Sequence, residues 1–186
     1  KMKNYWQNAV TFDEYIKETE RRIEVQNPED DHNEYYELGL QRMNRTLKTY
    51  KADEEQLETL KSKNFNGKIL IITEPWCGDA SATVPAVSKF FEGHNEVRIF
   101  YRDSDTSLID QFLTNGTQSI PKILILNEDF SLKNVWGPRP QYGTELLKKF
   151  KENPETYPRE EFYNDLQVYY AKNKGKDAIQ EILELL

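Results

Sequence analysis

Four short apolar runs divide the middle of the chain and predict the strands of a sheet. They lie at residues 68–73, 97–101, 122–126 and 132–136. The first and third are continuous runs rich in Ile and Leu, as in strands buried on both faces, whereas the second alternates. Helical patterns separate or follow them at residues 79–91, 107–113 and 144–151. This order predicts an α/β sandwich in which crossovers join parallel strands and a hairpin ends the sheet.

Charged sequence with helical spacing flanks this centre on both sides. Before it, Thr11 and Glu14 form a candidate capping box, a second stripe spans residues 31–50, and Asp53 caps a third helix. Two amphipathic stretches follow the centre. We therefore expect a helical N-terminal extension, a core and a helical C-terminal extension, at residues 1–66, 67–152 and 153–186. Both extensions are expected to cover the core.

Composition narrows the class of protein. The chain has 186 residues, with 25 Lys and Arg against 32 Asp and Glu and a net charge of −7, so no nucleic-acid partner is expected. No apolar stretch approaches the ~18 residues of a membrane span. Residues 1–6 lack the apolar region of a secretory signal, and one cysteine cannot close a disulfide within the chain. We expect a cytoplasmic monomer with no membrane partner.

The stretch from Glu74 to Ala80 carries the most informative chemistry. It follows a buried strand and opens a helix, so Cys77 is expected at a helix N-terminus, where unpaired amides and the helix dipole stabilise a thiolate. Glu74 and Asp79 act in the opposite direction, because a nearby carboxylate disfavours a second negative charge. The direction of the net pKa shift therefore stays open. A functional thiol is favoured over a buried structural cysteine.

At this motif the sequence resembles the thioredoxin superfamily. Trp76-Cys77-Gly78 matches the family's active-site turn, whose usual form is Trp-Cys-Gly-Pro-Cys. Further matches at family spacing are the helix proline Pro85, the loop glycine Gly116, the cis-proline pair Ile120-Pro121 and the groove glycine Gly137. The turn and both extensions look similar to a thioredoxin-like subgroup from bacteria of the Bacteroidetes type. The resemblance covers roughly residues 55–152 and implies a three-layer sandwich around a mixed sheet of about four strands.

Two departures from the family pattern limit the chemistry. Ala80 stands where the family has its second, resolving cysteine, and Ile71 stands where thioredoxins keep a buried Asp. A dithiol cycle needs an internal thiol to attack the mixed disulfide, so the chain as written is not a dithiol reductase. An alanine introduced in place of a native cysteine would give the same pattern, although Ile71 argues against that origin.

The resemblance also implies a substrate groove beside Cys77. A cis bond between Ile120 and Pro121 would hold the Ile120 backbone open to pair with an extended substrate. The groove residues that match the family, or lie beside those that do, are Trp76, Gly78, Asp79, Ala80, Ile120, Pro121, Gly137 and Arg139. Arg139 is expected either to stabilise a thiolate or clamp a substrate carboxylate, or to be a surface cation. For Lys122 the surface position is favoured.

These features favour a thioredoxin-like protein acting through one thiol. Cys77 would form a mixed disulfide with a low-molecular-weight thiol or a protein cysteine, and an external thiol would resolve it. The alternative is a non-catalytic module that binds extended peptides or a protein partner. Iron–sulfur ligation by a dimer and a one-cysteine peroxidase are weaker alternatives. No cofactor or metal is expected, because His32 and His94 lack partners at ligand spacing and are interpreted as surface residues.

Overall fold

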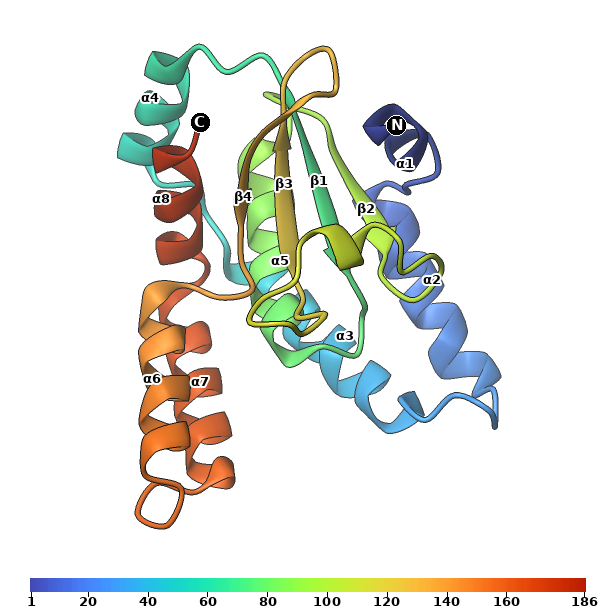
Figure 1. Ribbon diagram of the computed structural model, residues 1–186, viewed down its shortest axis with the longest axis vertical. Coiled ribbons are helices and arrows are strands. Elements are labelled where there is room, and N and C mark those ends of the chain that lie inside the picture. The colour runs from blue at the N-terminus through green and yellow to red at the C-terminus, as the bar shows by residue number, and fades with distance from the viewer.

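A computed structural model describes residues 1–186 and contains one mixed four-stranded sheet (Figure 1). Its strands are β1 (Lys68–Thr73), β2 (Val97–Tyr101), β3 (Lys122–Leu126) and β4 (Leu132–Trp136), in the spatial order β2-β1-β3-β4. All four predicted strands are confirmed. The fold is a mixed α/β sandwich of the thioredoxin-like kind, as the sequence predicts.

The direction of β3 differs from the prediction. β1 and β2 are parallel, but β3 runs antiparallel to β1, and β4 runs antiparallel to β3. Because an antiparallel β3 begins at the end of the sheet where β2 finishes, no crossover helix is needed between them. The predicted helix at 107–113 is accordingly wrong, and this segment holds only the short 3₁₀ turn η1 (Ile109–Gln111).

The alternation of side chains along the strands divides the core between the two faces of the sheet. Ile69, Ile71 and Ile99 point to one face and pack with the long helices, whereas Leu70 and Ile72 point to the other. The second face is covered by the N-terminal helix and by the segment between β2 and β3, which lies in front of the sheet in Figure 1. Both faces of β1 are therefore buried, one by the long helices and the other by the N-terminal helix and the segment between β2 and β3. This explains why the apolar run of β1 is continuous and does not alternate.

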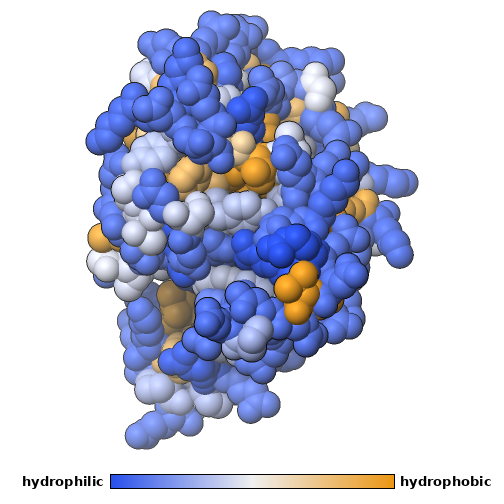
Figure 2. Space-filling model, turned by 90° about the vertical axis from the view of Figure 1, so that its right-hand side faces the viewer, coloured by the Kyte–Doolittle hydropathy of each residue, from blue (hydrophilic) through white to orange (hydrophobic).

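The helices surround this sheet. They are α1 (Met2–Gln7), α2 (Phe12–Val25), α3 (Asn33–Thr49), α4 (Glu54–Lys63), α5 (Gly78–Phe91), α6 (Gln141–Glu152), α7 (Arg159–Asn173) and α8 (Lys176–Glu184). The sequence did not predict α1, but it did predict the capping box of α2 and the Asp53 cap of α4, and both are confirmed. No helix is both long enough and apolar enough to cross a bilayer. The face that bears α1 and α2 is largely hydrophilic, with small apolar patches (Figure 2).

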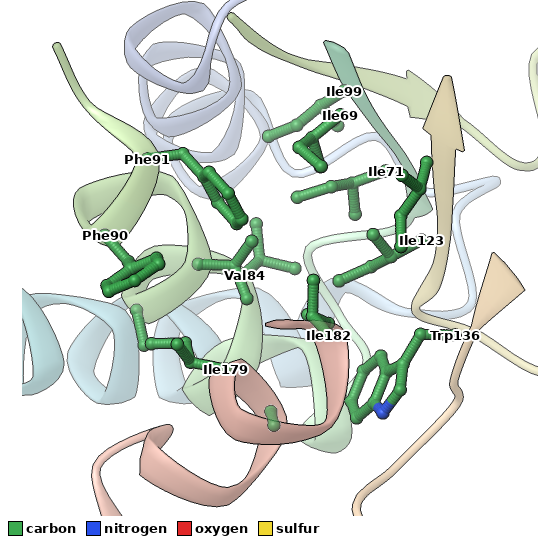
Figure 3. Packing of buried hydrophobic residues seen from close by; sticks show 14 of the residues in the cluster. Ile69, Ile71, Val84, Phe90, Phe91, Ile99, Ile123, Trp136, Ile179 and Ile182 are labelled. Carbon is green, nitrogen blue, oxygen red and sulfur yellow. The ribbon is translucent and has the colours of Figure 1, made fainter. Parts of the chain in front are cut away.

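The C-terminal helix α8 is part of the main core. Ile179 and Ile182 are fully buried and face Val84 and Phe90 of α5 (Figure 3). The turn that leads into α8 depends on Gly175, because its φ is +79° and a Cβ there would lie 2.4 Å from the Cβ of Ala86. The chain therefore returns from α7 to the centre of the molecule.

Replacing Ile182 with Ala is expected to lower the free energy of unfolding by about 2–5 kcal/mol, because the substitution leaves a cavity in a fully packed core. The matched control is Glu184→Ala, an exposed position on the same helix, for which a change within about 0.5 kcal/mol is expected. Urea denaturation measures both. Equal stability of the two variants would show that α8 does not contribute to the core in solution.

Candidate active site

Cys77 occupies the N-cap of α5, directly after the turn that leaves β1. The residue as a whole is partly exposed, and its thiol donates a hydrogen bond to the Ile120 carbonyl, with 3.4 Å between Sγ and the oxygen. The Ile120–Pro121 peptide bond is cis, as the resemblance implies. Ile120 and Pro121 are buried. The fold therefore brings the only thiol of the chain against the cis-proline loop.

The pKa of Cys77 is raised to about 12, which settles a direction that the sequence left open. Burial of the thiol is the largest cause, and the Asp79 carboxylate adds to it. The backbone N–H groups of Ala80 and Asp79 and the charge of Arg139 lower the pKa, but they do not compensate. The helix N-terminus therefore acts in the predicted direction and is outweighed by desolvation and by a neighbouring charge.

Asp79 is held by two residues that are distant in sequence. Arg139 donates through Nε and Nη2 to the two carboxylate oxygens, at 3.3 and 2.8 Å, and the Tyr170 hydroxyl donates to Oδ1. The Asp79 and Arg139 side chains are 12% and 17% exposed. Arg139 is therefore neither a free surface cation nor an open clamp for a substrate, because the chain's own carboxylate occupies its fork.

Glu74 is turned into a separate network. It is buried, accepts from the Asp103 backbone N–H at 2.9 Å, and pairs with the Arg22 guanidinium at 3.2 Å. Burial raises the pKa of Glu74, against the opposing effects of these two partners. Arg22 also pairs with Glu18, so a helix of the N-terminal extension anchors the residue three positions before the cysteine.

Trp76 lies between two side chains that the sequence did not connect with it. The His32 ring stacks on it with 4.2 Å between ring centroids, and the Arg102 guanidinium lies 5.0 Å from its centroid. His32 therefore contacts the active-site turn and is not an isolated surface residue. A cavity of about 630 Å³ adjoins Trp76 and is lined mainly by acidic and polar side chains, including Glu29, Asp31 and Asp103.

The loop after β4 packs closely on the cis-proline loop. Gly137 has φ +119°, and a Cβ there would lie 2.4 Å from the Pro121 carbonyl oxygen, so only glycine fits. The Gly137–Pro138 bond is also cis. Lys122 is buried and donates to the Gly137 carbonyl at 3.2 Å and to the Thr114 hydroxyl. The favoured interpretation of Lys122 as a surface cation is therefore wrong, because its amine ties together the loops beside the site.

Most of the chain matches one known protein family. Residues 25–151 match a family described as thioredoxin, which is more than half of the sequence. The chain therefore belongs to the thioredoxin family. The match includes α3 and α4 as well as the sheet. No curated protein matches the chain.

Two solved structures share the thioredoxin-like fold. One is the crystal structure of an HIV epitope-scaffold, with a TM-score of 0.67, 15% identity, and coverage of 98% of this chain and 94% of that chain. The other is a 1.5 Å crystal structure of a protein of unknown function from Pseudomonas aeruginosa, with a TM-score of 0.58 and 17% identity, covering 95% and 91%. At these identities the likeness supports the fold alone.

Within this thioredoxin-family fold, the two departures from the family pattern lie in the core. Ala80 and Ile71 are both buried among apolar side chains. No other thiol is present, and no cluster of three or more His, Cys, Asp or Glu side chains is placed to hold a metal ion. The protein chemistry available at the site is therefore that of one thiol, the groups that set its pKa, and the backbone beside it.

Helices of both extensions supply site residues that the sequence analysis missed. Gln167 of α7 donates to the Gly78 carbonyl at 3.3 Å, and Tyr170 one turn further reaches Asp79. A Cβ built on Gly78 would lie 3.7 Å from Nη1 of Arg42 in α3. No local motif marks these residues, because each acts across a long sequence separation. The helical spacing of the apolar residues around Tyr170 was the only sequence signal.

Asp79→Asn is expected to lower the pKa of Cys77 and to increase its alkylation by iodoacetamide at pH 7.5 by about tenfold, the effect of one pKa unit. The substitution removes the negative charge that raises the pKa of the thiol and leaves Arg139 without its carboxylate partner. The pH dependence of the rate, followed by intact mass, gives the pKa. Glu128→Gln, in an exposed turn, is the charge-matched control. An unchanged pKa in Asp79→Asn would contradict the electrostatic account.

Proposed function

We propose that this thioredoxin-like protein acts in thiol–disulfide exchange through the single thiol of Cys77. The observation that supports the proposal is the position of Sγ in the partly exposed residue Cys77, 3.4 Å from the carbonyl oxygen of the residue before the cis-proline, at the start of α5. In the thioredoxin fold this is where a disulfide substrate meets the attacking sulfur. Its partners would be a low-molecular-weight thiol or a protein cysteine.

The proposed reaction takes one disulfide and gives one mixed disulfide. Cys77 loses its proton to solvent, and the thiolate attacks one sulfur of R–S–S–R′, which forms Cys77–S–S–R and releases R′–S⁻. R′–S⁻ takes up a proton from water. The Cys77 sulfur is oxidised, and R′ is reduced to its thiol. A second, external thiolate then attacks the mixed disulfide and returns Cys77 to its reduced form.

The raised pKa affects both steps. Few thiolates exist at neutral pH, so attack by Cys77 is slow. Cys77 is also a poor leaving group, because a thiol of high pKa leaves slowly when another thiolate attacks the mixed disulfide. With Ala80 in place of a resolving cysteine, no internal thiol shortens the life of that adduct. The site therefore favours slow capture and long retention over rapid turnover.

Treatment with 2-hydroxyethyl disulfide is expected to add one 2-mercaptoethanol unit to Cys77. The initial rate is expected to rise about tenfold per pH unit between pH 7 and 9.5. This range lies well below the pKa of about 12, so the fraction of Cys77 present as thiolate increases tenfold with each pH unit. Intact mass spectrometry measures the rate, and Cys77→Ser is the blank. The proposal would be rejected if the folded protein stayed unmodified throughout this range.

Ala80→Cys is expected to restore resolution. The new thiol lies one helical turn from Cys77, so it attacks the mixed disulfide, releases the small thiol and leaves an internal disulfide. The adduct then fails to accumulate, and the mass of the product falls by two hydrogens. Ala80→Ser tests whether a slightly larger polar atom is tolerated in this buried place. A stable adduct in a well-folded Ala80→Cys protein would contradict the proposed geometry.

A binding module without turnover is the second candidate. It is supported by the raised pKa and by the Ile120 backbone N–H, which makes no turn or loop hydrogen bond within the chain. Cys77→Ser separates the two functions. Capture of a peptide that survives this substitution, with unchanged affinity, favours binding, whereas capture that disappears favours covalent exchange.

A further inference from the structure

One cation beside the active-site turn has no counter-ion. Arg42 lies on α3 and is partly buried, yet the ion pairs of the chain all involve other cations. Burial, and then the charge of Arg45, lower the pKa of Arg42. Its nitrogen atoms are not among the buried polar atoms that lack a hydrogen-bond partner. An arginine stays charged in proteins, so this guanidinium is charged, partly desolvated and without an ion-pair partner.

A second donor points to the same place. A Cβ built on Gly78 would lie 3.7 Å from Nη1 of Arg42 and 3.1 Å from Nε2 of Gln167, so both nitrogens lie close to one point beside the residue after Cys77. Gln167 donates one amide hydrogen to the Gly78 carbonyl, which leaves its second hydrogen free. Two donors from helices of opposite extensions thus converge where glycine leaves room.

Exposed apolar side chains adjoin both donors. Leu38 precedes Arg42 by one helical turn, and Tyr163 precedes Gln167 by one turn, with exposed fractions of 44% and 52%. The two helices approach each other at Gly78, because Nη1 of Arg42 and Nε2 of Gln167 both lie within 4 Å of the Cβ built there. The donors are therefore bordered by surface that can receive the carbon chain of a small molecule.

We propose that Arg42, with Gln167, binds a carboxylate of the disulfide that reacts with Cys77, so that the preferred substrate is an acidic low-molecular-weight disulfide. This inference rests on the proposed function and defines its substrate class. The guanidinium and the amide can each donate to one carboxylate, and Arg139 cannot take this role because Asp79 fills it. Arg42 is a specificity residue, and Cys77 remains the reacting group.

The proposed preference for an acidic disulfide is the opposite of what the other charges of the molecule would favour. The net charge is −7, and the cavity beside Trp76 is lined by acidic side chains, so without Arg42 a cationic disulfide would be attracted. The order of reactivity among disulfides of different charge therefore distinguishes a local anion site from the overall field of the protein.

The test compares 3,3′-dithiodipropionic acid, neutral 2-hydroxyethyl disulfide and cationic cystamine at pH 8, with the rate of adduct formation measured by intact mass. We expect the acidic disulfide to react fastest with the natural chain, and Arg42→Gln to lower its rate about threefold to tenfold relative to the neutral one, as for one partly screened charge. Lys48→Gln, an exposed cation on the same helix, is the control and leaves the ratio unchanged.

A second probe does not depend on disulfide exchange. Iodoacetate and iodoacetamide alkylate the same sulfur and differ mainly by one carboxylate, so the ratio of their rates reports the attraction of an anion. Arg42→Gln is expected to lower this ratio, and the iodoacetamide rate of the same variant corrects for any change in the thiol itself. Fastest reaction with cystamine, or a ratio unaffected by Arg42→Gln, overturns the inference while the proposed function stands. Failure of every disulfide with normal alkylation rejects the proposed function instead.

Discussion

The ion pair between Asp79 and Arg139 is the interaction on which the rest of the site depends. Asp79 stands in the first turn of α5, where the helix dipole favours a carboxylate, but the same position places its charge beside the thiol. Arg139 and Tyr170 both donate to it and so bring the loop after β4 and helix α7 to the active-site turn. One carboxylate thereby sets the electrostatics of the thiol and fixes three elements relative to each other.

The other carboxylate of the motif has a different role because it has different partners. Glu74 faces Arg22 and the Asp103 backbone, so it ties α2 and the end of β2 to the turn. The local sequence does not distinguish the roles of the two acidic residues, since each lies within three positions of Cys77. Their separation into a structural anchor and a group that raises the pKa of the thiol depends on cations placed 52 residues before one and 60 residues after the other.

The sequence predicted those features that repeat or that depend on neighbouring residues. The strands follow from runs such as Lys68–Thr73, and the caps of α2 and α4 follow from a Thr or Asp side chain that accepts from the backbone N–H three positions on. The direction of β3 did not follow, because side-chain periodicity is the same for parallel and antiparallel strands. Helix α1 escaped prediction because six residues with one buried anchor, Trp6, are too short to show a period.

The sequence predicted which residues form the centre of the candidate site, but it did not predict the pKa of the thiol. The motif and its spacing located Cys77 and the cis-proline, and these lie in contact. The pKa of the thiol depends instead on desolvation and on Asp79, Ala80 and Arg139 together, which only the packed structure brings to one point. Neighbours of the turn such as Arg42 come from helices that the sequence analysis interpreted as covers of the core, so the same packing that made these helices look structural placed them at the site.

The missing second cysteine and the raised pKa are physically consistent with each other. In a dithiol cycle a high-pKa first thiol would slow both attack and release, and the buried carboxylate of thioredoxins would be needed to move the second proton. Here Ala80 and Ile71 leave no second thiol and no such carboxylate, so nothing in the chain requires Cys77 to be a good leaving group. A thiol that is slow to ionise and slow to leave is unsuited to rapid turnover, and it fits the long-lived mixed disulfide that we propose, which an external thiol would resolve.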